Sequence, residues 1–279
     1  MEVDAIIARM TQCLRGVKGV ECLVLGGSRA RQTHTPDSDI DLGIYYSAAA
    51  PLELEALQLL AQQNDDQHRE QLLTAPGAWG RWINGGGWLT VNGLSVDWLY
   101  RDLDLAAAVI EDCLGGQIQI DYQKGHPHGF ASHMFMAEVA LSQPLWDPLG
   151  KFARLKSLTQ PYPALLKEAV IKKFQAEAEF SIRVARKSLQ RADVAYVAGC
   201  CFRTVACLMQ VLFAINEQYF MNEKGAVALA STFARRPEQL EARVNQAFAH
   251  LRAEPNALSE VLDLFSDLAQ EIKALTPAL

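Results

Sequence analysis

The sequence lacks the features that mark membrane-spanning and exported proteins. No uninterrupted apolar run approaches the ~20 residues that a helix needs to cross a bilayer. The first residues, Met1-Glu2-Val3-Asp4, are acidic and show no secretory signal pattern. Half of the 279 residues are apolar and 21% are charged, which is ordinary for a globular protein and long enough for two domains. We therefore expect a cytoplasmic protein with no membrane segment.

Cysteine is also scarce, and none of the six cysteines forms a CxxC pair of the kind that binds metals. They are Cys13, Cys22, Cys113, Cys200, Cys201 and Cys207. Cys200 and Cys201 are neighbours in an apolar helical pattern, a poor geometry for a disulfide between them. We expect reduced, mostly buried thiols.

Basic charge is in short supply over most of the chain. The net charge is −6, and it divides unevenly, with −10 on residues 1–150 and +7 on residues 151–191. An acidic chain without interleaved basic and aromatic residues makes a nucleic-acid partner unexpected. The local basic block has two interpretations, a solvated helix face or a surface that holds a polyphosphate.

The spacing of apolar residues predicts an α/β (α+β) chain, with a mixed-sheet domain at 1–145 and an all-helical bundle at 146–279. Strands are predicted at 21–25, 40–46, 88–91 and 94–100, with a weaker signal at 117–122. Helices are predicted at 3–16, 52–73, 164–190, 193–221, 225–235, 238–252 and 256–274. The proline-rich segment 143–163 is interpreted as the boundary zone. We expect the helical domain to close a cleft over the sheet domain.

Two aspartates share one face of the second predicted strand. In Ser38-Asp39-Ile40-Asp41-Leu42, alternate residues point the same way, so Asp39 and Asp41 project together while Ile40 and Leu42 enter the core. Parallel carboxylates repel each other unless a cation lies between them. The pattern therefore indicates a divalent-metal platform, although acidic pairs also occur on ordinary solvent faces.

A glycine pair ends the strand before it. Gly26-Gly27 lets the backbone approach a ligand closely, and the backbone N–H groups with the Ser28 hydroxyl can bind phosphate oxygens. The alternative is a tight turn with a capping serine.

A predicted hairpin supplies a third carboxylate. Asn92-Gly93 between two β-prone runs is the strongest short-range hairpin signal. A two-residue turn pairs Val91 with Leu94 and places Trp88 opposite Asp97. If this hairpin lies beside the strand that carries Asp39 and Asp41, the three carboxylates converge, as in-line phosphoryl transfer with two metal ions requires.

In combination, these residues resemble the DNA polymerase β nucleotidyltransferase superfamily. Gly26-Gly-Ser-Arg-Ala-Arg31 with Ser38-Asp-Ile-Asp-Leu42 is similar to its antibiotic (aminoglycoside and lincosamide) branch. More loosely, 212–219 and 222–225 resemble the helical C-terminal domains of that branch. The resemblance covers residues ~20–100 most specifically and does not name the acceptor.

The resemblance implies roles for the residues that match. Asp39 and Asp41 would coordinate Mg²⁺ or Mn²⁺, and Asp97 would complete the site as a metal ligand, a proton acceptor or both. Gly26, Gly27, Ser28 and Ser38 would contact the triphosphate of an NTP, expected to be ATP. Lys224, at a predicted helix start, is the preferred further cation for the phosphates.

Two weaker signals stay open. His126-Pro127-His128 and His133 form a local cluster that lacks a fourth zinc ligand, so a loop with incidental histidines is favoured over a metal site. Glu138 is a second candidate for the general base, against the simpler reading of an exposed helix carboxylate.

Three functions compete. The first is transfer of a nucleoside monophosphate to a hydroxyl of a small molecule, with release of pyrophosphate. The second is modification of a protein, as in antitoxin-like AMPylating enzymes, or of RNA. The third is a non-catalytic nucleotide-binding protein. The intact carboxylates favour an enzyme, and the acidic charge and large helical region favour a small acceptor. The sequence does not indicate the oligomeric state.

Overall fold

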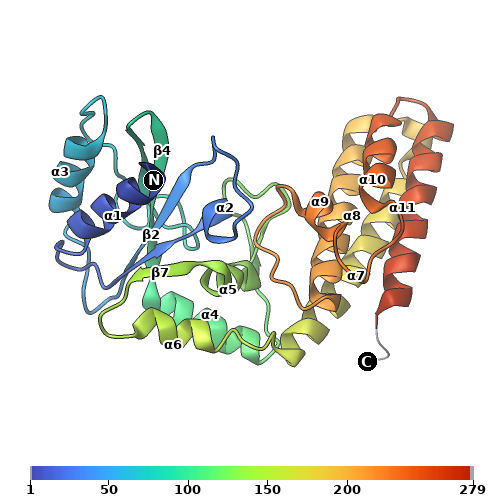
Figure 1. The fold of residues 1–279 in the computed structure, drawn as a ribbon. Coiled ribbons are helices and arrows are strands. Elements are labelled where there is room, and N and C mark those ends of the chain that lie inside the picture. Colours follow the sequence, from blue (N-terminus) through green and yellow to red (C-terminus); the bar gives the residue numbers. More distant parts are fainter. Residues whose placement is uncertain (1, 277–279) are drawn as a thin grey trace. The chain divides into compact units, whose positions relative to one another are not determined.

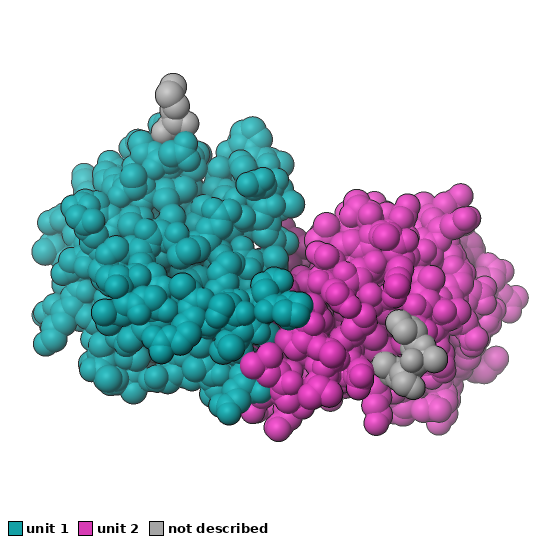
Figure 2. All heavy atoms as spheres, turned by 60° about the horizontal axis from the view of Figure 1, so that its bottom comes forward, with its two compact units in different colours: residues 1–111, 135–161 teal, residues 112–134, 162–279 magenta. Residues whose placement is uncertain are grey.

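The computed structural model describes residues 2–276 (Figure 1). Within them the chain forms two compact units, coloured separately in Figure 2. Unit 1 holds the residues up to 111 and residues 135–161, and unit 2 holds residues 112–134 and those from 162 onward. The chain therefore passes between the units three times. These units are defined by compactness alone, so the domain boundary that the sequence predicts at residue 145 stays a prediction.

Unit 1 is a mixed sheet flanked by helices, as the sequence predicts (Figure 1). Its strands are β1 (Cys22–Leu25), β2 (Ile40–Tyr46), β3 (Gly86–Val91), β4 (Leu94–Asp102) and β7 (Gln143–Trp146). Its helices are α1 (Glu2–Leu14), α2 (Gly27–Ala30), α3 (Leu54–Asn64), α4 (Leu103–Leu114), α5 (Ser132–Leu141) and α6 (Lys151–Ser157), of which α4 and α5 run across the division between the units. The strand order is β3-β4-β2-β1-β7; β2 and β4 are parallel and the other neighbours antiparallel.

One face of this sheet carries an apolar core. Alternate residues of the two parallel strands enter it, namely Ile40, Leu42 and Ile44 of β2 and Val96, Trp98 and Tyr100 of β4. Helix α1 adds Ile6, Met10 and Leu14 at helical spacing. Because side chains alternate along a strand, the residues between these apolar positions, Asp41 and Asp97 among them, point to the opposite face.

The predicted hairpin is confirmed. Asn92 and Gly93 both have positive φ, 51° and 75°, as the favoured two-residue hairpin turn requires. Val91 pairs with Leu94, and Trp88 pairs with Asp97.

The predicted helix over 52–73 is too long. Helix α3 ends at Asn64, and the next residue, Asp65, turns its buried carboxylate away from the helix. It accepts hydrogen bonds from the Arg69 side chain at 2.6 and 2.9 Å and from the Thr90 N–H at 2.9 Å. These bonds tie the chain to β3, so the polar contacts override the helical pattern.

Unit 2 is the predicted helical bundle with a small hairpin. It contains α7 (Ala164–Arg186), η1 (Leu189–Arg191), α8 (Val194–Ile215), α9 (Ala226–Ala230), α10 (Leu240–Ala249), α11 (Pro255–Leu275), and the strands β5 (Ile120–Asp121) and β6 (Phe130–Ala131). The predicted helix to residue 221 is wrong at its end: α8 stops at Ile215, where the Asn216 amide donates to the carbonyls of Leu212 and Arg235. Among the described helices, α8 alone is long and apolar enough to cross a membrane, but most of it is buried, as in a central core helix.

Candidate active site

Two of the predicted carboxylates lie side by side on neighbouring strands. Asp41 of β2 is directly opposite Asp97 of β4 in the parallel register. Neighbouring strands lie ~4.8 Å apart and paired residues point to the same face, so the two carboxylates leave the sheet together. Asp39 lies exposed just before β2, two residues from Asp41. The hairpin therefore lies beside the Asp39–Asp41 segment, as the predicted convergence of the three carboxylates requires.

Burial and mutual repulsion perturb these carboxylates. Burial, followed by the charges of Asp39 and Glu138, raises the pKa of Asp41. Burial and the charges of Asp41 and Asp39 raise the pKa of Asp97 to about 7, although a hydrogen bond with Trp88 lowers it. Carboxylates that oppose one another's ionisation are stabilised by a shared cation. Three clustered carboxylates are oxygen ligands of the kind that Mg²⁺ and Mn²⁺ prefer, so this set fits the expected metal.

The glycine loop passes close to Asp41. Gly26 donates its N–H to the Asp41 carbonyl at 2.8 Å. Gly27 has φ of 62°, and a Cβ on it would collide with the Asp41 carboxylate. A side chain at position 27 would therefore strain the backbone and push the Asp41 carboxylate from its place. Gly26 and Gly27, with the half-buried Ser28 after them, bring backbone beside the carboxylates, as a phosphate-binding loop must.

Two arginines of the Gly26–Arg31 motif stabilise the backbone of the site, although the sequence analysis assigned them no role. The buried Arg29 donates to the carbonyls of Ser38 and Asp39, at 2.5 and 3.1 Å, and so fixes the approach to β2. Arg31 donates to the Gly27 carbonyl at 3.2 Å, and its charge lowers the pKa of Asp41. Their positions within Gly26–Arg31 were the available signal, because a cation beside paired acids is electrostatically favourable.

A buried ion pair lies on the same sheet face. Arg101 is four residues beyond Asp97 on β4 and is 3% exposed. It donates to both carboxylate oxygens of Glu138 on α5, at 2.6 and 2.8 Å. Because Glu138 compensates a buried guanidinium, its predicted alternative as an exposed helix carboxylate is wrong. The same pairing also counts against Glu138 as a free general base, since a base must be available to accept a proton.

A stacked aromatic pair lies at the hairpin beside Asp97. Trp88 lies opposite Asp97 in the hairpin register, is 58% exposed, and stacks on Trp79 with ring centroids 4.7 Å apart. An exposed indole held in place by stacking on a half-buried one offers a flat face for a planar or sugar ring.

The remaining predicted residues lie in different surroundings. The Ser38 hydroxyl accepts a hydrogen bond from the Thr35 N–H at 2.9 Å and so stabilises the turn before Asp39. Lys224 is exposed and belongs to unit 2, next to Gly225 at the start of α9. Their contacts with a nucleotide stay predictions.

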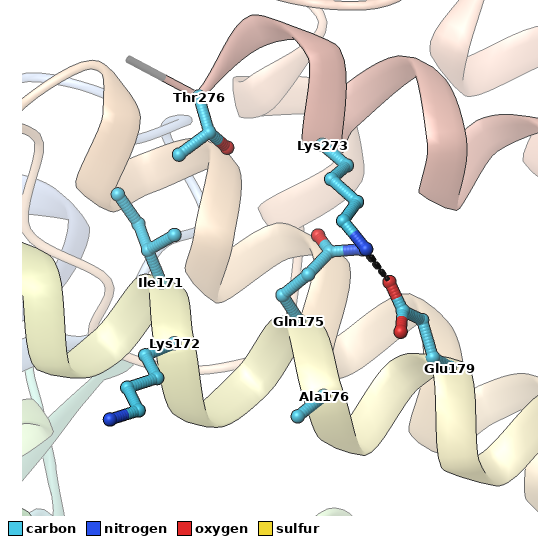
Figure 3. Close-up of a pocket in the computed structure, with 7 residues that line it drawn as sticks. All are labelled: Ile171, Lys172, Gln175, Ala176, Glu179, Lys273 and Thr276. Atoms are coloured by element: carbon cyan, nitrogen blue, oxygen red, sulfur yellow. Dashed lines mark hydrogen bonds and ion pairs between the residues drawn. The ribbon is translucent and has the colours of Figure 1, made fainter. Parts of the chain in front are cut away.

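The helical unit has its own surface pocket, of about 380 Å³, between α7 and α11 (Figure 3). Its most polar contact is internal: Lys273 donates to Glu179 at 2.9 Å, and the Gln175 amide donates to the same oxygen at 3.2 Å. The described residues that line the pocket hold one ion pair and no cluster of catalytic groups, so it is not a candidate active site.

Known protein families match two parts of the chain. Residues 10–75, which include the glycine loop, Asp39 and Asp41, match the nucleotidyltransferase domain. The match confirms the predicted enzyme class, nucleotidyl transfer, and supports the predicted superfamily, whereas the antibiotic branch stays a prediction. Residues 132–224 match a domain of unknown function, DUF4037.

The chain was also compared with whole proteins. No curated protein matches it. A nucleotidyltransferase-like protein from Exiguobacterium sibiricum is similar in structure, with 10% identity and a TM-score of 0.42, over 94% of this chain and 71% of that one. At this TM-score the two structures share too little for conclusions to pass from one to the other.

Proposed function

We propose that the nucleotidyltransferase uses a divalent metal to transfer a nucleoside monophosphate from an NTP to a hydroxyl group of a small molecule. The observation that carries the proposal is the pairing of Asp41 with Asp97 beside the Gly27 loop. Asp39, Asp41 and Asp97 would hold Mg²⁺ or Mn²⁺. Gly26, Gly27 and Ser28 would contact the phosphates, with Ser38 and Lys224 as further predicted contacts.

In the proposed reaction the acceptor oxygen forms a bond to the α-phosphorus while the bond from that phosphorus to the leaving oxygen breaks, releasing pyrophosphate. When bound, the metal supplies charge neutralisation for the phosphates. The Gly27 backbone orients the nucleotide, and Arg31 adds positive charge beside Asp41. Asp97, directly opposite Asp41 in the parallel register, is the candidate to accept the proton of the acceptor hydroxyl.

The proposal specifies donor, acceptor class and compartment. ATP is the expected donor, and the stacked Trp79 and Trp88 beside Asp97 support a ligand with a ring. The acidic net charge and the large helical region support a small-molecule acceptor over RNA or a protein. Six free cysteines fit the reducing cytoplasm.

Pyrophosphate release tests the proposal. The full chain is incubated with each NTP, Mg²⁺ and one acceptor at a time: aminoglycosides, lincosamides, other polyhydroxylated small molecules, a mixed protein fraction and RNA. We expect acceptor-dependent release with a small molecule, abolished by EDTA and by Asp41→Asn. Release only with protein or RNA would transfer the function to the second class. Metal-dependent ATP binding without release for any acceptor would indicate a nucleotide-binding protein instead.

A further inference from the structure

In unit 2, the histidine-rich segment before β6 lies beside a cysteine and a glutamate of two helices. The His128 side chain is 4% exposed. Its Nε2 lies 3.6 Å from the Cys207 sulfur of α8 and 3.9 Å from Glu177 Oε1 of α7. The sequence places these residues far apart, so the missing ligands of the predicted histidine loop come from the two longest helices of the bundle.

We propose that His128, Glu177 and Cys207 bind a divalent cation of the zinc type. One imidazole nitrogen, one thiolate and one carboxylate are typical zinc ligands, and a thiolate disfavours Mg²⁺ and Ca²⁺. With usual Zn–N and Zn–S bonds in a tetrahedron, the nitrogen and sulfur lie about 3.5 Å apart. The observed separation is 3.6 Å, and the three ligand atoms all lie within 4.8 Å of one another.

The surroundings of His128 support a bound cation. Among the described residues, its Nε2 has only the long contact with the Cys207 sulfur at 3.6 Å and the approach to Glu177 at 3.9 Å. A buried ring nitrogen without a strong hydrogen bond is costly, and ligation would remove that cost at Nε2. The backbone is held independently, because the His128 N–H donates to Glu223 at 3.1 Å and Glu223 also pairs with His126 at 3.4 Å.

Arg203 is the competitor for this cation. Its guanidinium lies 2.5 Å from Glu177 Oε1, the oxygen that faces His128. The Arg203 side chain is 53% exposed, so it can move into solvent with little loss of packing. Binding would then replace one positive partner of Glu177 with another and release the Cys207 proton to solvent. The protein would supply three ligands, leaving a fourth position for water.

Metal binding to the full chain tests the site. The protein is stripped with a chelator and titrated with Zn²⁺ against a chromophoric competitor, and Co²⁺ replaces Zn²⁺ to report thiolate ligation by its charge-transfer band. We expect one tight Zn²⁺ site per chain, distinct from any weaker binding at the carboxylates of unit 1, and a thiolate–cobalt band. His128→Gln and Cys207→Ser should each weaken binding by about 100-fold or more, at or above the effect of losing an outer-shell partner.

Three variants sharpen the result. Cys201→Ser changes another fully buried cysteine of α8 and should leave Zn²⁺ affinity unchanged, as should Asp41→Asn in unit 1. Arg203→Met should tighten binding about tenfold by removing the competitor for Glu177. Circular dichroism and thermal melting without metal show whether each variant is folded.

The proposal is overturned if the wild type binds Zn²⁺ no more tightly than the folded His128→Gln variant, or if Co²⁺ shows no thiolate band. Binding by Arg203→Met alone would also overturn it, because the natural cluster would then be an ion-pair network closed by Arg203.

Discussion

The carboxylates of unit 1 and the histidine cluster of unit 2 are built in opposite ways. Asp39, Asp41 and Asp97 lie on or beside two neighbouring strands whose register puts Asp41 opposite Asp97. His128, Glu177 and Cys207 come from a loop and two helices, and they meet only through helix packing. Strand periodicity and a two-residue turn fix side-chain positions locally, whereas helix packing fixes them through the whole bundle. The first kind of site is therefore visible in a sequence and the second is not.

The largest expected effect separates the two sites by function. Asp41→Asn should lower kcat/KM for pyrophosphate release at least about 10³-fold, because charge stabilisation at the reacting phosphate is lost. The double variant Asp39→Asn/Asp41→Asn should be little worse, since both acids serve one metal. Glu55→Gln, which removes an exposed acid from α3, is the matched control. Near-normal activity of Asp41→Asn would remove the carboxylate site and break the comparison.

The same contrast explains which features of the fold and of the carboxylate site could be predicted from the sequence. The turn at Asn92-Gly93 fixed the Trp88–Asp97 pairing, and alternation placed Asp41 away from the core. The parallel pairing of β2 with β4 brings Asp41 beside Asp97. The sequence did not predict this pairing, because no local pattern identifies the neighbour of a strand in a sheet. The length of α3 was missed because Asp65 bonds to Arg69 and to β3, contacts that helical periodicity does not contain.

Variants of the Arg101–Glu138 ion pair show whether Glu138 stabilises the fold or takes part in catalysis. Glu138→Gln should lower the free energy of unfolding by about 3 kcal/mol, because it leaves the buried guanidinium without its counterion. Denaturant unfolding measures this loss. The double variant Arg101→Leu/Glu138→Leu should recover most of the stability. A Glu138→Gln protein of unchanged stability that has lost turnover would make Glu138 the general base and Asp97 a metal ligand.

Substitutions in the glycine loop show whether nucleotide binding needs the space beside Asp41 or only the positive φ of Gly27. Gly27→Ala should weaken Mg²⁺-ATP binding about 100-fold, or ~2.7 kcal/mol, because its Cβ would collide with the Asp41 carboxylate. Gly93→Ala is the matched control: its φ is also positive, 75° against 62°, but its Cβ would enter open space. Both variants should lose a similar ~1 kcal/mol of stability from backbone strain. Calorimetry with ATP measures binding, and equal affinities would exclude the loop from nucleotide contact.

The pH dependence of Asp97 gives the smallest effect and the finest test. Its folded pKa of about 7 lies above the ordinary 3.8, so without metal the protonated carboxyl is favoured by folding. Its contribution to stability is complete below about pH 4 and is lost as pH rises through 7. After allowance for solvent screening, the metal-free protein should lose about 2 kcal/mol between pH 5 and 8, and Asp97→Asn should lose much less.

Metal reverses the sign of this dependence, and that reversal assigns the role of Asp97. A cation binds the ionised carboxylate, so wild-type Mg²⁺ affinity should rise up to about pH 7 and then level off, whereas the affinity of Asp97→Asn should vary less over that range. If Asp97 is chiefly a metal ligand, Asp97→Asn should bind Mg²⁺-ATP weakly at every pH. If it is chiefly the base, the variant should bind Mg²⁺-ATP almost normally and lose ~10²–10⁴-fold in turnover. Turnover near the wild-type value would exclude Asp97 from both roles and leave the carboxylate site with Asp39 and Asp41 alone.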